Sequence, residues 1–246
     1  MTKKTWIFDL DDTLIENHKD YSYPQLELVK WILDNTPYNG PDAHFILNRQ
    51  VEIDQSNVDL KGFGMERFPT SFQLTVKDIL GNLGMEPTSK QLEEVYAIGM
   101  RAFDDTRYAK SGLLPGAERV LDYLTEEGDD LLLLTKGDPK IQKRKIKATG
   151  LRRWFPYSNI NVVLHKDAQV VRDLVGERDK SRVYHVGNSI RSDIGPALEV
   201  GIKAVYLPCE TWAYERQHNG LSDLPNQENL IKLANLDDII GVHLSL

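Results

Sequence analysis

The sequence predicts an α/β protein, a doubly wound and Rossmann-like parallel sheet into which an α-helical domain is inserted. Two observations support this fold class. Five short apolar runs of strand character alternate with helical segments. About 120 residues separate the first run from the second, and this interval contains helical patterns where a normal crossover would be much shorter. The five candidate strands are Thr5–Leu10, Leu131–Thr135, Ile160–Leu164, Val183–Val186 and Ala204–Leu207.

The long interval after the first strand is expected to form a helical cap domain. Within it, Thr88 and Gln91 have the spacing of a capping box, which predicts the start of a helix. The stretch from Pro115 to Gly128 is typical of the helix that leads back to the sheet. We therefore predict a catalytic core at residues 1–16 and 111–246, and a cap at 17–110.

The composition indicates an ordinary globular chain, with 41% hydrophobic and 27% charged residues among 246. A single cysteine, Cys209, fits a reducing cytoplasm, and the first residues predict neither a signal peptide nor a membrane span. The net charge of −7 argues against nucleic acid as a partner. The basic run at 136–153 is an exception, and it is interpreted as a solvated helix face or as a surface that attracts an anionic substrate.

Three aspartates crowd the end of the first strand, in the run FDLDDTL at 8–14. Like charges this close repel unless a cation neutralises them, and Mg²⁺ takes carboxylate oxygens as ligands. A calcium loop of the D-x-D-x-D-G type does not fit, because Leu14 stands where glycine is required and Asp20 where glutamate is expected. Because ligands of parallel sheets bind beyond the carboxyl ends of the strands, the site is expected at that edge.

Four motifs at strand ends carry a family resemblance: FDLDDTL, LLLLTKGD, a lysine, and VGNSIRSD, in that order. Together they resemble the haloacid dehalogenase superfamily over residues 5 to 208, and the insertion is similar to its type 1 cap. The resemblance implies that Asp9 is a nucleophile that forms an aspartyl-phosphate, and that Asp11 is the general acid and base. Thr135 would bind a phosphoryl oxygen with the backbone of Lys136 and Gly137, or it would simply end a strand.

The third and fourth motifs complete the implied site. Lys166 best fits the lysine that holds nucleophile and phosphoryl group, whereas Lys140, Lys143 and Lys145 are also explained by a solvated helix face. The fourth motif has an amide where the superfamily commonly has an acid. Its residues Asn188 and Asp193 would bind Mg²⁺ together with Asp9 and the carbonyl oxygen of Asp11.

The acid at position 11 favours a phosphatase, since the superfamily's hydrolytic dehalogenases carry a non-acidic residue there. A phosphomutase or a phosphate-binding scaffold are the alternatives. We expect a cytoplasmic monomer or homodimer that acts on a small phosphorylated metabolite, without nucleic acid or membrane as partner. We predict that His185 is a core histidine with its hydrogen bonds satisfied. Trp212 and Tyr214 either line the pocket or pack the C-terminal segment onto the core. Lys61 and Arg67 belong either to a specificity loop or to a connection between helices.

Overall fold

The computed structural model describes residues 3–209 and 221–245 of the chain. The chain divides into two compact units, one made of Met1–Glu16 with Tyr108–Leu246 and the other of Asn17–Arg107. The role of residues 17–110 as a cap stays a prediction. Trp212 and Tyr214 lie outside the described residues.

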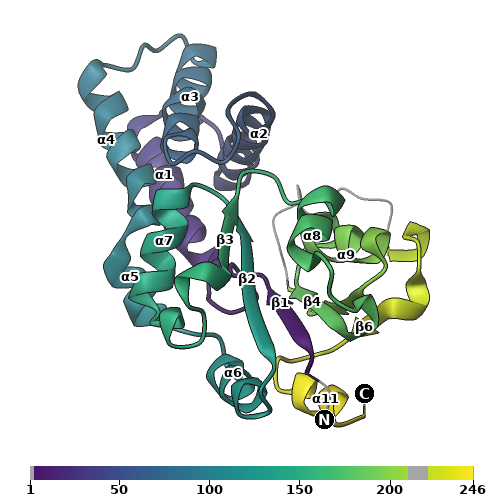
Figure 1. Ribbon diagram of the computed structural model, residues 1–246. Coiled ribbons are helices and arrows are strands. Elements are labelled where there is room, and N and C mark those ends of the chain that lie inside the picture. Colours follow the sequence, from purple (N-terminus) through teal and green to yellow (C-terminus); the bar gives the residue numbers. More distant parts are fainter. Residues whose placement is uncertain (1–2, 210–220, 246) are drawn as a thin grey trace. The chain divides into compact units, whose positions relative to one another are not determined.

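Within the described part of the first unit, six strands form one parallel sheet in the order β3-β2-β1-β4-β5-β6 (Figure 1). This confirms the predicted parallel α/β sheet. The sixth strand was not predicted, because it is only three residues long and half-exposed and therefore gives no apolar run. The strands are β1 (Thr5–Phe8), β2 (Asp130–Lys136), β3 (Ile160–Val163), β4 (Val183–Gly187), β5 (Lys203–Tyr206) and β6 (Leu230–Lys232).

Both faces of the sheet are buried. Successive side chains of a strand point to opposite faces, so Trp6 and Phe8 join one apolar cluster while Ile7 joins the other. The leucines of β2 divide between the two clusters in the same alternating way. Because each face needs apolar side chains, the central strands are continuous apolar runs in the sequence.

Helices cover each face of the sheet (Figure 1). Residues of α6, α7 and α11 belong to the cluster that contains Trp6, and residues of α8 and α9 belong to the cluster that contains Ile7. Helix α6 lies inside the predicted return segment Pro115–Gly128, which confirms that prediction. The helices are α6 (Ala117–Glu126), α7 (Pro139–Ala148), α8 (Ala168–Val175), α9 (Gly195–Val200) and α11 (Asp238–Ser245), with short turns η2 (Leu151–Arg153), η3 (Tyr157–Asn159), η4 (Lys180–Arg182), η5 (Ile190–Ile194), η6 (Leu221–Asp223) and η7 (Gln227–Asn229).

The second unit is helical. The predicted capping box is present: Thr88 Oγ1 accepts a bond from the Gln91 backbone at 3.3 Å, and Gln91 Oε1 accepts one from the Thr88 backbone at 2.9 Å. Arg67 is buried and paired with Asp54, and the glycines before it lie in a helix connection. The elements are α1 (His18–Asn35), α2 (Ala43–Lys61), α3 (Arg67–Asn82), α4 (Ser89–Met100) and η1 (Arg101–Phe103), followed by α5 (Asp105–Ser111) across the division of the units.

Across residues 3–209 and 221–245, the structure contains no helix that is both long and apolar enough to cross a membrane.

Candidate active site

The candidate site lies at the carboxyl ends of β1, β2 and β4. Strand β1 is central, with β2 on one side and β4 on the other. From β2 the chain continues to β3, and it then returns across the sheet to β4. The sheet therefore has a topological switch point beside β1, which is where ligands of doubly wound sheets bind. Asp9 follows β1, Thr135 is the last residue but one of β2, and Asn188 follows β4.

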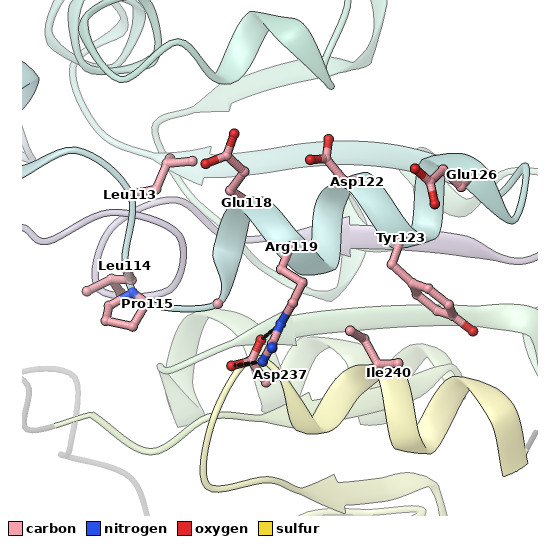
Figure 2. Close-up of a pocket in the computed structure, with 11 residues that line it drawn as sticks. Leu113, Leu114, Pro115, Glu118, Arg119, Asp122, Tyr123, Glu126, Asp237 and Ile240 are labelled. Carbon is pink, nitrogen blue, oxygen red and sulfur yellow. Dashed lines mark hydrogen bonds and ion pairs between the residues drawn. The ribbon is translucent and has the colours of Figure 1, made fainter.

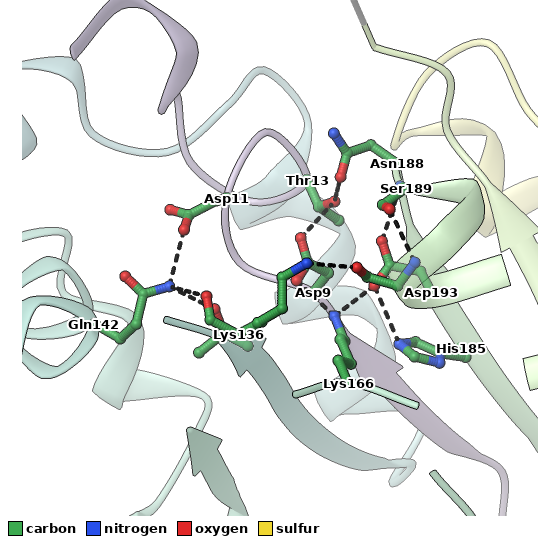
Figure 3. A network of polar contacts seen from close by, with 12 residues as sticks. Asp9, Asp11, Thr13, Lys136, Gln142, Lys166, His185, Asn188, Ser189 and Asp193 are labelled. Atoms are coloured by element: carbon green, nitrogen blue, oxygen red, sulfur yellow. Dashed lines mark hydrogen bonds and ion pairs between the residues drawn. The ribbon is translucent and has the colours of Figure 1, made fainter. Parts of the chain in front are cut away.

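Asp9 is held by hydrogen bonds on both of its carboxylate oxygens (Figure 3). Lys166 Nζ donates to Oδ1 at 2.6 Å, and Thr13 Oγ1 donates to Oδ2 at 3.2 Å. The Asp9 backbone N–H also donates to the Val186 carbonyl at 2.9 Å, which ties the residue to the end of β4. Only 8% of the residue is exposed, so this carboxylate is fixed and largely dry.

Lys166 links two buried carboxylates, since its ammonium contacts both Asp9 and Asp193. Burial favours the neutral form of Lys166, but the two carboxylates outweigh it and raise the lysine pKa above its usual value. Burial likewise opposes ionisation of Asp193, but Lys166 and a bond from the Ser189 backbone hold the pKa of that carboxyl below its usual value. The Lys166–Asp193 pair is therefore charged.

Of the two carboxylates that contact Lys166, Asp9 is the one whose negative charge is less fully offset by its surroundings. Burial raises its pKa to about 7, and the charge of Asp193 adds to the rise while Lys166 opposes it. Asp193 has the extra backbone donor, whereas among the described residues the second oxygen of Asp9 has the long bond from Thr13 alone. A weakly compensated and oriented carboxylate is suited to attack an electrophile.

The loop after β4 is built around Asp193. The turn η5 has the wide hydrogen-bonding pattern of a π-helix, a feature often found at functional sites. The Ser189 backbone N–H donates to Asp193 Oδ2 at 2.9 Å, and the Ser189 side chain accepts from the Ser192 backbone at 2.9 Å. A Cβ on Gly187 would overlap the Asp193 carboxyl group, so this close approach requires glycine.

Asn188 presents its amide oxygen toward Asp9. The Thr13 hydroxyl lies 3.4 Å from Asn188 Oδ1 and 3.2 Å from Asp9 Oδ2, so the two oxygens share one neighbour. Figure 3 shows the Asn188 oxygen turned to Thr13 and its nitrogen turned away. Across the described residues there is no group of three or more histidine, cysteine, aspartate or glutamate side chains placed to hold a metal ion. The amide oxygen of Asn188 is not among the side-chain types in that group, but it is also able to bind a metal ion.

Asp11 points to another part of the site. In Figure 3 its side chain is directed toward Gln142, while that of Asp9 is directed toward Thr13 and Lys166. Gln142 Nε2 donates to Asp11 Oδ2 at 2.8 Å and to Thr135 Oγ1 at 2.6 Å. The structure therefore connects Asp11 with Thr135 through a residue of α7 that the sequence analysis did not identify.

Lys145 is a correction to the sequence analysis. The lysines of the 136–153 run were explained by a solvated helix face, but Lys145 is only 2% exposed and its Nζ lies 2.8 Å from Asp11 Oδ1. The sequence contained a signal for this. Ile141, Gln142, Lys145 and Ile146 form the buried stripe of α7, and their spacing places Lys145 on the apolar face.

Two further residues have surroundings that the sequence analysis did not predict. His185 is fully buried, and burial lowers its pKa to about 3, with Lys166 adding to the effect, so the ring is neutral. It was predicted to be a satisfied core histidine, but among the described residues neither ring nitrogen has a hydrogen-bond partner. Lys136 was predicted to act through its backbone, and its side chain donates to Ser192 Oγ at 2.7 Å.

A separate pocket lies between α6 and the segment that includes α11 (Figure 2). None of its lining residues belongs to the network of Figure 3. Four carboxylates line it, and its one basic residue, Arg119, is already paired with Asp237. Such a pocket repels an anionic ester, so the carboxyl edge of the sheet is the better candidate for binding a phosphate group.

Comparison with known proteins identifies the family. Residues 3–201 match the haloacid dehalogenase-like hydrolase family. The chain belongs to this family. The resemblance seen in the four sequence motifs is thereby confirmed, and the protein is a hydrolase of the haloacid dehalogenase type.

Individual relatives agree with this assignment. The chain is 26% identical to a glyceraldehyde 3-phosphate phosphatase of Pyrococcus abyssi (strain GE5 / Orsay), over 83% of this chain and 81% of the relative. A haloacid dehalogenase-like hydrolase from Xanthomonas campestris superposes with a TM-score of 0.75 at 21% identity, covering 99% of this chain and 91% of that one. The HAD-hydrolase YfnB from Bacillus subtilis, solved bound to magnesium, superposes with a TM-score of 0.62 at 17% identity, covering 98% and 99%. The two solved structures show a shared fold.

Proposed function

We propose that this hydrolase is a Mg²⁺-dependent phosphatase that cleaves a small phosphomonoester through an aspartyl-phosphate on Asp9. The observation that carries the proposal is the buried Asp9 carboxylate, oriented by Lys166 and Thr13, with an acid two residues later. The kinship to a glyceraldehyde 3-phosphate phosphatase supports the same reaction class. A hydrolytic dehalogenase has no need of the acid at position 11, because halide leaves without a proton.

The reaction has two steps. In the first, an Asp9 oxygen forms a bond to phosphorus as the ester P–O bond breaks, and the leaving oxygen takes a proton from Asp11. In the second, the Asp11 carboxylate takes a proton from a water molecule, whose oxygen attacks the phosphorus and releases Asp9 and inorganic phosphate. The ammonium of Lys166, the Thr135 hydroxyl and the backbone of Lys136 and Gly137 offset charge on the phosphoryl oxygens.

The donors at this edge of the sheet fit Mg²⁺. Magnesium prefers oxygen ligands, and Asp9 and Asn188 each place an oxygen beside the Thr13 hydroxyl. We assign these two residues, the Asp11 carbonyl oxygen and Asp193 to the magnesium site, with Asp193 also oriented by Lys166 and the Ser189 backbone. When bound, the cation neutralises charge on the phosphoryl group.

The test is hydrolysis by the purified protein of p-nitrophenyl phosphate and a panel of sugar, triose and nucleoside monophosphates, with Mg²⁺ or with EDTA. We expect Mg²⁺-dependent release of one phosphate per ester consumed, which distinguishes hydrolysis from a mutase reaction. Asp9→Asn should abolish turnover while the protein stays folded, and acid-quenched wild type should carry a phosphoryl group on the peptide that contains Asp9. Activity of Asp9→Asn within tenfold of wild type would refute the covalent mechanism.

We also propose that the protein acts in the cytoplasm as a monomer or homodimer, with neither nucleic acid nor a membrane as partner. The single cysteine supports the reducing compartment, and the net charge of −7 argues against nucleic acid as a partner. Light scattering after gel filtration measures the oligomeric state, and a species larger than a dimer would contradict it.

A further inference from the structure

Two buried side chains of α7 reach the Asp11 carboxylate from a helix that otherwise carries exposed basic residues. Gln142 and Lys145 are each 2% exposed, whereas Lys143 and Lys147 on the same helix are exposed. Burying a lysine is costly unless its charge is paired. The sequence therefore places a polar pair at the one face of α7 that is turned to the protein interior.

Each oxygen of Asp11 has its own donor. Lys145 Nζ lies 2.8 Å from Oδ1, and Gln142 Nε2 donates to Oδ2 at 2.8 Å. A planar carboxylate bonded at both oxygens by groups of one rigid helix cannot rotate without breaking a bond. The orientation of Asp11 is thus set by α7 as well as by its own backbone.

Both donors are themselves fixed. The Lys145 ammonium lies 5.7 Å from the centre of the Tyr108 ring, which supports it by a cation–π contact. Gln142 Nε2 also donates to Thr135 Oγ1 at 2.6 Å and lies 3.4 Å from the Lys136 carbonyl oxygen. Gly137 makes room for this arrangement, since a Cβ there would lie 3.2 Å from Gln142 Cδ and the backbone φ of +152° suits glycine.

We propose that Gln142 and Lys145 are positioning residues that aim the Asp11 carboxyl group for proton transfer and keep it in register with Thr135. This inference rests on the proposed function, because it concerns how the proposed general acid and base is held. Neither residue is required to touch substrate. Their effect on turnover passes through Asp11, which makes it separable from a general loss of folding.

The test compares substrates that differ in their need for a proton. The alcohol of an alkyl phosphate such as glycerol 3-phosphate is a poor leaving group and needs a proton from a general acid. The phenolate of 2,4-dinitrophenyl phosphate is a good leaving group and departs without one. Lys145→Met should lower kcat/KM for the alkyl ester at least ~10-fold more than kcat/KM for the aryl ester, because kcat/KM covers the steps up to departure of the leaving group and leaves out hydrolysis of the aspartyl-phosphate, which is common to both esters. Lys145→Arg should recover part of the loss, and Lys143→Met, exposed on the same helix, is the matched control.

A double substitution supplies the second arm. If Lys145 acts through Asp11, then Lys145→Met should cause little further loss in an Asp11→Asn background, because strongly coupled residues are not additive. Equal loss on both esters, or an undiminished effect of Lys145→Met in the Asp11→Asn background, would overturn the inference. Should Lys145→Met fail to fold, Gln142→Met in the same two arms decides the question.

Failure of the proposed function gives a different result. If Asp9→Asn keeps activity, or if Asp11→Asn lowers kcat/KM of both esters equally, the phosphatase mechanism as proposed is wrong. If those two variants behave as expected and the α7 variants show no dependence on the leaving group, only the positioning role is wrong.

Discussion

Asp9→Asn should stabilise the folded protein at alkaline pH in the absence of Mg²⁺, even though it removes the nucleophile. Burial raises the pKa of Asp9 to about 7, against an ordinary value of 3.8. A carboxyl group whose pKa is raised by folding stabilises the fold while it is protonated, and it loses that contribution as the pH rises through the folded pKa. Asparagine has almost the same shape and carries no charge at any pH.

The magnitude follows from the two pKa values. The difference between about 7 and 3.8 corresponds to a maximum of roughly 4 kcal/mol in the free energy of unfolding. Between pH 5 and pH 8, wild type should lose about 2.5 kcal/mol that the variant keeps, because at pH 5 a part of the penalty is already present. The Lys166–Asp193 pair remains in the variant and holds the lysine charge.

The assay is urea unfolding in EDTA at pH 5 and pH 8, followed by tryptophan fluorescence, to which Trp6, buried on the strand that precedes Asp9, contributes. Asp173→Asn, at an exposed position of α8, serves as the control and should change stability by less than ~0.5 kcal/mol at either pH. Added Mg²⁺ should stabilise wild type and reduce the advantage of Asp9→Asn. A difference between Asp9→Asn and wild type that is independent of pH would refute the reasoning.

Three other substitutions test the site. Gly187→Ala should displace the Asp193 carboxyl group and lower kcat/KM by ~100-fold. The control is Gly81→Ala, because a Cβ at that position meets nothing within 4 Å. Normal kinetics of Gly187→Ala would show that the structure relaxes around the added methyl group at no cost. Lys166→Met should leave two buried carboxylates without their cation and cost ~3–5 kcal/mol of stability in urea unfolding at pH 8, and a cost below ~1 kcal/mol would contradict the buried pair. Asn188→Asp should tighten Mg²⁺ by ~10-fold in a titration of activity, and an unchanged Mg²⁺ dependence would place Asn188 outside the metal site.

The sequence was informative wherever chemistry follows directly on a strand. Asp9 and Asn188 come just after apolar runs, and parallel strands bring their carboxyl ends to one edge, so their proximity could be predicted from order alone. The family motifs added Lys166, whose loop position after β3 gives no periodic signal. The structure then placed its ammonium on Asp9.

Residues supplied by helix faces were harder to predict. Lys145 was grouped with its basic neighbours because most residues of α7 are charged or polar. Its spacing of four residues from the buried Ile141 nevertheless placed it on the buried face of the helix. Thr13 was overlooked because a threonine in a turn has many ordinary roles. These cases share one physical cause: a polar side chain on a buried face has the sequence pattern of a surface residue until its partner is known.

The charge of the assembled site connects the metal to the substrate. Three carboxylates, Asp9, Asp11 and Asp193, share the site with three ammonium groups, Lys136, Lys145 and Lys166, so the site is near neutral when all six groups are charged. A phosphomonoester brings about two negative charges, and a divalent cation brings two positive ones. The site is therefore expected to bind the ester together with the cation more tightly than the ester alone. An acid in place of Asn188 would add a negative charge beside both. Asn188→Asp should therefore lower the Mg²⁺ concentration needed for half-maximal activity while raising KM for the ester, and a fall in both would show that charge does not govern binding at this edge of the sheet.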